Sequence, residues 1–72
     1  MIRWRLAVVM AERNISNKEL ARLTGMNPNS ISRLRVRRYL NRIDGDTLNA
    51  LCKALKCEPG ELMAYEEDEA ES

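Results

Sequence analysis

The sequence predicts a compact all-α fold of five helices in one small domain. Apolar residues recur three and four positions apart over most of the chain, as on the buried face of a helix, and helix-capping signals separate these segments. The length of 72 residues allows one small core. We expect a domain over residues 1–65 and an acidic, disordered tail over residues 66–72, which contain no large apolar residue.

A first helix is expected from about Ile2 to Arg13. Its core stripe has helical spacing and consists of Ile2, Leu6, Val9 and Met10. A second apolar stripe on an adjacent side consists of Trp4, Val8 and Ala11. This second stripe either packs within the chain or meets a second subunit, and the rival surface for a second subunit consists of Leu62, Met63 and Tyr65.

A second helix is expected over residues 17–24. Ser16 can cap its N-terminus, and Glu19, three residues on, completes a capping box. Gly25 can adopt the left-handed conformation that ends a helix. The second helix is therefore bounded at both ends by local signals.

A third helix is expected over residues 28–36, close behind the second. Asn27 can cap it, and Pro28 suits its first turn because the missing N–H has no helical partner there. Ile31 and Leu34 turn inward, so that the outward residues are Asn29, Ser32, Arg33 and Arg35. A pair of short helices with a basic outer face is the layout that places one helix in the DNA major groove.

A connector over residues 37–46 and two further helices complete the chain. The connector has three basic residues, Arg37, Arg38 and Arg42, and its apolar anchors are Tyr39, Leu40 and Ile43. A fourth helix is expected over residues 47–56 with Asp46 as its cap, and its buried face consists of Leu48, Leu51, Cys52 and Leu55. A short fifth helix is expected over residues 59–64.

Charge is distributed unevenly along the chain. Residues 1–43 contain ten Arg or Lys and two acidic residues, whereas residues 44–72 contain two Lys and nine acidic residues. An alternative is that exposed helices simply carry charge. Because the basic half also contains the helix pair, this asymmetry favours a surface that faces a polyanion.

The chain resembles the Cro/C1-type, phage-repressor-like helix-turn-helix family. The matching elements are Glu19-Leu20-Ala21, Gly25 with Met26, Ile31-Ser32, and the segment from Leu48 to Leu62. The resemblance implies a lambda-repressor-like domain with its helix-turn-helix at the second and third helices. It also implies sequence-specific binding of double-stranded DNA by a transcriptional regulator, expected to be a repressor and a homodimer at least on DNA.

The resemblance further implies which residues meet DNA. The expected base-contacting residues are Pro28, Asn29, Ser32 and Arg33. By the same resemblance, Asn17 at the start of the second helix is expected to contact the DNA backbone. The other expected backbone contacts follow from charge or polarity near the helix pair, and they are Arg13, Lys18, Ser30, Arg35, Arg37, Arg38 and Arg42.

Other classes of function find little support. The chain has no His, its carboxylates cluster toward a tail without fixed geometry, and its three glycines form no phosphate-binding loop, so we expect no enzyme and no cofactor. Cys52 and Cys57 are five positions apart, which suits neither a zinc site nor a CxxC redox pair, so we expect buried, reduced cysteines and no metal. No apolar run could span a membrane, and we expect a cytoplasmic protein.

Two alternative functions stay open on the sequence. The protein could be the antitoxin of a toxin–antitoxin pair that regulates its own promoter, with the acidic tail binding a basic protein partner. It could instead be a protein–protein interaction module that uses the helix pair to dock on another protein.

Overall fold

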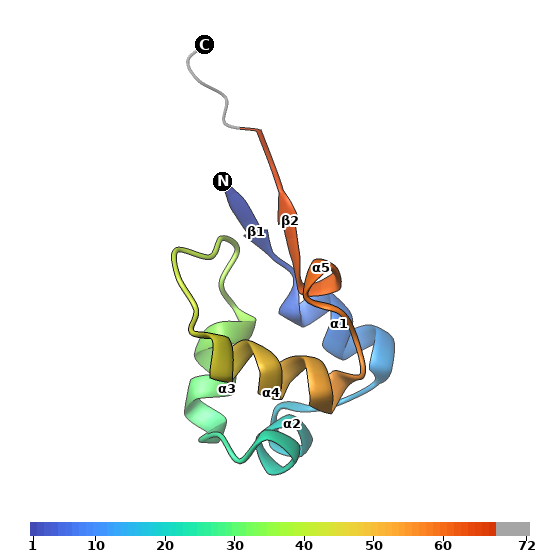
Figure 1. The fold of residues 1–72 in the computed structure, drawn as a ribbon. Helices are drawn as coiled ribbons and strands as arrows, with labels where there is room; N and C mark the ends of the chain where they lie inside the picture. Colours follow the sequence, from blue (N-terminus) through green and yellow to red (C-terminus); the bar gives the residue numbers. More distant parts are fainter. Residues whose placement is uncertain (68–72) are drawn as a thin grey trace.

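Five helices and a two-stranded antiparallel ribbon make up the computed structural model, which describes residues 1–67 (Figure 1). The elements in chain order are β1 (Ile2–Trp4), α1 (Leu6–Arg13), α2 (Asn17–Thr24), α3 (Pro28–Arg35), α4 (Gly45–Leu55), α5 (Pro59–Leu62) and β2 (Met63–Tyr65). The helices pack together, and the ribbon extends from them at the end opposite α2. The predicted five helices are present, but the ribbon means that the fold is mostly helical rather than all-α.

One core joins β1 to all five helices. Its buried members are Trp4, Leu6, Val9, Met10, Leu20, Ala21, Ile31, Leu51, Leu55 and Leu62. No polar or charged side chain is buried among residues 1–67. Because helices of this length are marginal alone, the burial of these apolar faces holds the helices in place.

The predicted start of the first helix is wrong. Residues Ile2–Trp4 form β1, which pairs with β2 in the register Ile2–Tyr65, Arg3–Ala64 and Trp4–Met63. The Arg5 N–H donates to the Leu62 carbonyl at 2.7 Å, and α1 begins only after this bond. Trp4 reaches the core, whereas Ile2 lies farther out on the ribbon and is 38% exposed, so Ile2 does not belong to the core stripe.

The expected second stripe of the first helix is also absent. Trp4 is 5% exposed and packs within the chain, which excludes it as a contact for a second subunit. Val8 and Ala11 lie on α1 and are exposed. The alternative surface for a second subunit, made of Leu62, Met63 and Tyr65, is not exposed as a whole either. Leu62 is buried, while Tyr65 is 73% exposed.

The predicted capping of α2 and α3 is confirmed at three positions. The Ser16 hydroxyl accepts a hydrogen bond from the Glu19 N–H at 3.1 Å, and Gly25 ends α2 with a φ of 76°. The Asn27 amide oxygen accepts from the Asn29 N–H at 2.7 Å at the start of α3. The Glu19 carboxylate accepts from Arg22 instead of completing the expected capping box with Ser16, and this bond lowers the pKa of Glu19 below its ordinary value. These local bonds set the sharp turn between the two helices.

The fourth and fifth helices differ from expectation at their ends. The cap of α4 is Asp44 rather than Asp46, because the Asp44 carboxylate accepts from the Thr47 N–H at 2.8 Å. A hydrogen bond with the Thr47 side chain, and after it this bond from the Thr47 N–H, lower the pKa of Asp44. Helix α5 stops at Leu62, since the next three residues pair with β1 as β2.

The ribbon continues past the expected boundary between domain and tail. The Glu66 N–H donates to the Met1 carbonyl at 2.9 Å, and the Met1 amino group donates to the Glu66 carbonyl at 2.9 Å. Glu66 is therefore bonded to the other end of the chain. The remaining tail residues, 68–72, lie outside the part that the structure describes.

Two leucines of α2 provide a matched test of the core. We expect Leu20→Ala to lower the free energy of unfolding by about 2–5 kcal/mol, because Leu20 is fully buried and its truncation leaves a cavity. Leu23→Ala should change it by less than about 0.5 kcal/mol, since Leu23 lies on the same helix and is 44% exposed. Urea unfolding followed by circular dichroism measures both. Equal effects of the two substitutions would contradict this assignment of the core.

Candidate nucleic-acid interface

The outward face of α3 is polar and basic. Ile31 is buried and Leu34 packs against the core, so the opposite side of the helix faces solvent. The expected base-contacting residues are all exposed, namely Pro28, Asn29, Ser32 and Arg33. Ser30, expected at a phosphate, is half-buried. The helix thus presents amide, hydroxyl and guanidinium groups, which are the groups that read base edges.

A hydrogen bond ties the start of α2 to the end of α3. The Arg35 guanidinium donates to the Asn17 amide oxygen at 2.9 Å. This bond uses the amide oxygen of Asn17. The amide NH₂ group of Asn17 remains as a donor at the N-terminus of α2, next to the exposed Lys18. Donor groups and the helix dipole make that N-terminus suitable for an anion. Asn17 and Arg35, 18 residues apart, are therefore brought to one place by the fold.

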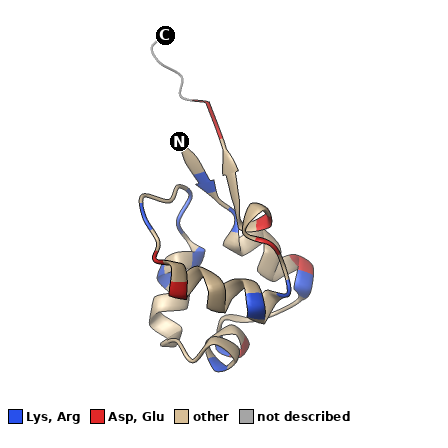
Figure 2. Cartoon of the chain, viewed as in Figure 1, with Lys and Arg blue, Asp and Glu red and all other residues tan. Residues whose placement is uncertain are grey.

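Unpaired arginines surround the C-terminal end of α3. Within residues 1–67, no ion pair or side-chain hydrogen bond engages the exposed side chains of Arg33, Arg37, Arg38 and Arg42. The acidic residues lie at the start of α4, where the connector ends, on α1, α2 and α5, and at the end of β2 (Figure 2). The three arginines of the connector therefore carry positive charge that is not held in an ion pair within residues 1–67.

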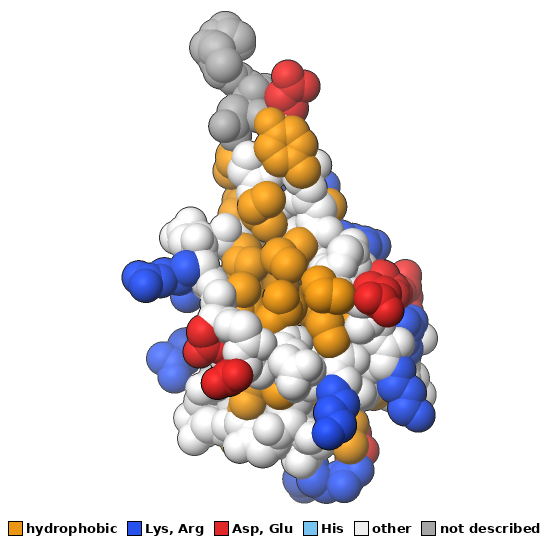
Figure 3. All heavy atoms as spheres, viewed as in Figure 1, with side chains coloured by type: hydrophobic (Ala, Val, Ile, Leu, Met, Phe, Trp, Pro, Cys, Tyr) orange, Lys and Arg blue, Asp and Glu red, His pale blue; other side chains and the backbone are white. Residues whose placement is uncertain are grey.

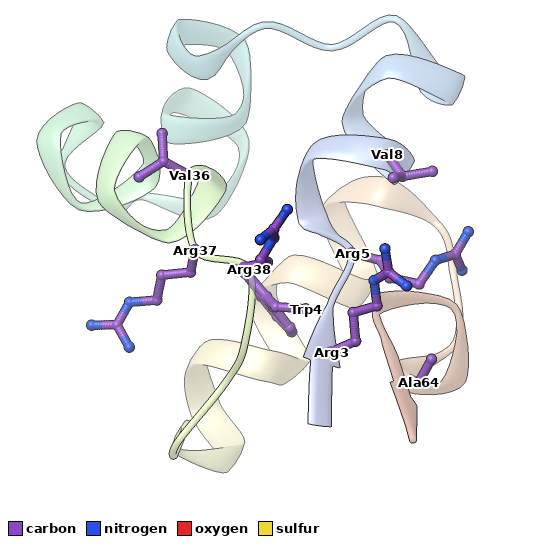
Figure 4. A pocket seen from close by; sticks show the side chains of 8 residues that line it. All are labelled: Arg3, Trp4, Arg5, Val8, Val36, Arg37, Arg38 and Ala64. Carbon is purple, nitrogen blue, oxygen red and sulfur yellow. The ribbon is translucent and has the colours of Figure 1, made fainter. Parts of the chain in front are cut away.

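Two further arginines, which sequence reasoning missed, lie beside the connector. Strand β1 and the residue that follows it place Arg3 and Arg5 across a surface hollow from Arg38 (Figure 4). The lining of this hollow is Arg3, Trp4, Arg5, Val8, Val36, Arg37, Arg38 and Ala64. The Arg37 side chain points away from the hollow. The only signal in the sequence was the high basic content of residues 1–43, since the expected first helix gave no reason to bring Arg3 near residue 38.

Both of these arginines already have acidic or carbonyl neighbours. The Arg5 guanidinium donates to the Glu61 carbonyl at 3.0 Å. The Arg3 guanidinium lies 3.9 Å from the Glu66 carboxylate, and the two side chains are 56% and 42% exposed. Such an exposed pair is weak, so Arg3 can move to another anion at little cost.

Arg13 is placed apart from this basic group. Its guanidinium donates to the Leu55 carbonyl at 3.0 Å and to the Glu61 carboxylate at 3.2 Å, which joins the end of α1 to the end of α4 and to α5. The pKa of Glu61 is lowered, first by the hydrogen bond that its carboxylate accepts from the Glu58 N–H and second by the bond from Arg13. The arrangement gives Arg13 a role in holding helices together and offers no support for its predicted phosphate contact.

The two cysteines lie together at the end of α4. The Cys57 N–H donates to the Cys52 carbonyl at 3.0 Å, and both residues are free thiols, half-buried rather than buried as expected. Partial burial raises the pKa of both thiols, which keeps them protonated at neutral pH. Over residues 1–67 no group of three or more metal-binding side chains occurs, and no helix is long and apolar enough to cross a membrane.

A family model, a bacterial relative and a solved structure match the chain. A family model described as the Cro/C1-type HTH DNA-binding domain matches residues 5–68. The uncharacterized HTH-type transcriptional regulator YozG of Bacillus subtilis (strain 168) is 37% identical over 62 residues, which are 86% of this chain and 73% of that protein. A solved structure of a candidate DNA-binding protein from Bacteroides fragilis has a TM-score of 0.74 and 30% sequence identity, and the match covers 89% of this chain and 100% of that chain.

The different surroundings of Arg13 and Arg38 lead to a prediction. We expect Arg13→Ala to lower the free energy of unfolding by about 1 kcal/mol, because the Leu55 carbonyl loses its donor. Arg38→Ala, which removes an exposed and unpaired guanidinium, should leave stability unchanged within about 0.5 kcal/mol.

The effect of Arg13→Ala should also depend on pH. The pKa of Glu61 is lowered in the folded chain, first by the bond from the Glu58 N–H, which the variant keeps, and then by Arg13. The stability that depends on Arg13 and ionised Glu61 is present at neutral pH and is lost as pH falls through the lowered pKa, so Arg13→Ala should differ more from the unaltered chain at neutral than at acidic pH. Thermal unfolding of both variants at neutral and at acidic pH measures this. An Arg13→Ala protein as stable as the unaltered chain at neutral pH would contradict a stabilising role of Arg13 at the helix junction.

Proposed function

The chain belongs to the Cro/C1-type helix-turn-helix DNA-binding family, and we propose that it binds double-stranded DNA sequence-specifically as a transcriptional repressor. One observation supports this above the others: α3 presents Asn29, Ser32 and Arg33 to solvent, and the connector that follows carries unpaired arginines. Polar groups that read bases and positive charges that bind phosphates are thus adjacent on one surface.

In the proposed complex, the outward face of α3 enters the major groove. Asn29 can form two hydrogen bonds with an adenine, and Arg33 can form two with a guanine. Pro28 offers apolar contact for a thymine methyl group, and Ser32 can reach a base edge. Each well-placed pair of bonds contributes about 1–3 kcal/mol of discrimination between bases.

Contacts with the DNA backbone provide affinity and orientation. We assign them to the N-terminus of α2 with Asn17 and Lys18, and to the connector with Arg37, Arg38 and Arg42. Further phosphate contacts can come from Ser30 and Arg35 of α3 and from Arg3, which lies beside the connector. Such contacts carry no sequence information and weaken as salt rises. Occupation of a promoter by this complex would then block polymerase, which is the basis for proposing repression.

The base-reading role of Arg33 has a direct test. We expect Arg33→Ala to lower the preference for a duplex selected from a random oligonucleotide pool over a random duplex by about 5- to 150-fold, which corresponds to about 1–3 kcal/mol. Arg22→Ala is the matched control, because Arg22 is an exposed arginine on α2 that pairs with Glu19. Fluorescence anisotropy measures both affinities. An unchanged preference in Arg33→Ala would remove Arg33 from the readers.

The connector arginines should act differently. We expect the double variant Arg37→Ala, Arg38→Ala to bind all duplexes more weakly by a similar factor, and its salt dependence should be shallower by about one unit of slope for each phosphate that the variant no longer neutralises. Titrations at several salt concentrations measure the slope. A change in selectivity between sequences would show that these residues read bases. Absence of binding of the unaltered chain to any duplex at low salt would favour the protein-interaction alternative.

A further inference from the structure

The fold brings together two cysteines whose spacing gives no reason to expect a pair. Cys52 lies in the last turn of α4, and Cys57 follows the end of the helix. Between them, Lys56 adopts a left-handed conformation with a φ of 54°, which reverses the direction of the chain. The Cys57 N–H then donates to the Cys52 carbonyl at 3.0 Å. A bond of this kind closes a helix end and places the residue after the turn over the last helical turn.

The two side chains also meet. A hydrogen bond joins the Cys52 thiol to the Cys57 thiol, and neither thiol is part of a disulfide. An apolar contact across a helix end of this type is common, and here it consists of two groups that can react with each other. The turn at Lys56 thus provides the proximity that the CxxC spacing provides in other redox pairs.

Both cysteines can be reached from one side of the molecule. Cys52 and Cys57 line the same surface hollow, together with Leu48 of α4 and Pro59 of α5. Each cysteine is half-buried, so neither is sealed inside the core. A small solute that enters this hollow therefore meets both residues of the pair.

The surroundings of the pair keep both thiols protonated at neutral pH. Partial burial is the first cause, and it raises the pKa of both thiols. The Glu58 and Glu61 carboxylates raise the pKa of Cys52 further. Arg13 partly offsets the rise in the pKa of Cys57. Because the thiolate is the form that exchanges with a disulfide, exchange is slow at neutral pH and becomes faster as pH rises.

Apolar side chains gather on the face of the molecule where β2 meets α4 and α5 (Figure 3). The hollow that contains the two cysteines lies on α4 and α5 and is itself partly apolar, since Leu48 and Pro59 contribute to its lining. A low-molecular-weight disulfide has an apolar S–S group between polar ends, so its reactive part suits this lining.

We propose that Cys52 and Cys57 are a reversible modification site, at which a low-molecular-weight disulfide converts the two thiols into one intrachain disulfide. One cysteine thiolate attacks a sulfur of the small disulfide, whose S–S bond breaks and releases a first small thiol. The second cysteine thiolate then attacks the protein sulfur of this mixed disulfide and releases a second small thiol. Two protein thiols are thereby oxidised, one small disulfide is reduced, and the two protons end on the small thiols.

The site is separate from the surface assigned to DNA. Helix α4 runs from beside α3 to a C-terminal end that lies away from α3 (Figure 1). The inference goes beyond the proposed function and does not rest on it. The disulfide would join the last turn of α4 to the residue after the helix, next to the Leu55 carbonyl that Arg13 binds. Because a bond that the folded chain favours also favours the folded chain, we expect the oxidised protein to be more stable.

Equilibration with reduced and oxidised glutathione tests whether the fold organises the pair. We expect one intrachain disulfide, seen by mass spectrometry as the loss of two hydrogens without bound glutathione and without a second chain. Its equilibrium constant should be at least about tenfold larger in the native chain than in the same chain in urea, which corresponds to a reduction potential lower by about 30 mV. Urea preserves the spacing of the cysteines and removes their contact, so this ratio isolates the contribution of the fold.

A displaced cysteine is the matched control. The double variant Cys52→Ser, Lys53→Cys has two thiols that are closer along the chain than the natural pair. Lys53 is exposed, however, and lines a different hollow beside Leu23 of α2. We therefore expect its disulfide to be no more favoured in the native chain than in urea, with mixed disulfides to glutathione in its place. Circular dichroism reports whether the variant is folded.

Thermal unfolding gives a second measurement that needs no variant, because it compares the two redox states of the unaltered chain. We expect the oxidised chain to have the higher melting temperature. Equal equilibrium constants in the native chain and in urea would overturn the inference. An equally favoured disulfide in the control variant, or a lower melting temperature after oxidation, would overturn it as well.

Discussion

The burial of Leu20 and Ile31 in one core is the interaction on which the direction of α2 and α3 depends. Both side chains are 0% exposed, and each lies on the side of its helix away from the polar residues. The two helices have eight residues each, which is too short for stability in isolation, so their orientation comes from packing. The outward direction of Asn29 and Arg33 follows from this burial, and the Asn17–Arg35 hydrogen bond then links the ends of the two helices.

The ribbon adds a second constraint that joins the ends of the chain. Trp4 enters the core from β1, and the connector after α3 pairs with the free side of the same strand through Arg38 and Leu40. One strand of three residues therefore positions the connector arginines and brings Arg3 next to them. The charged surface near α3 is thus a consequence of one contact between distant segments.

The helix-turn-helix could be predicted from the sequence because its signals are local. Ser16, Gly25 and Asn27 act within a few residues of their own helix ends, and the apolar spacing fixes which side is buried. The ribbon could not be predicted in this way, since β1 pairs with residues about sixty positions away and each strand has only three residues. The choice between Asp44 and Asp46 as the cap of α4 also escaped prediction, because both carboxylates lie near the same helix start. The contacts of Arg13 with Leu55 and Glu61 arise only after α1, α4 and α5 have packed together.

The proposed function requires that DNA meets the chain at α3, the N-terminus of α2 and the connector. Backbone amide chemical shifts, measured by NMR during titration with a duplex selected from a random pool, test it residue by residue. We expect the largest changes at residues 17–18, 28–36 and 37–42, and small changes on the buried side of α4. Changes concentrated on α4 and α5, with α3 unaffected, would contradict it.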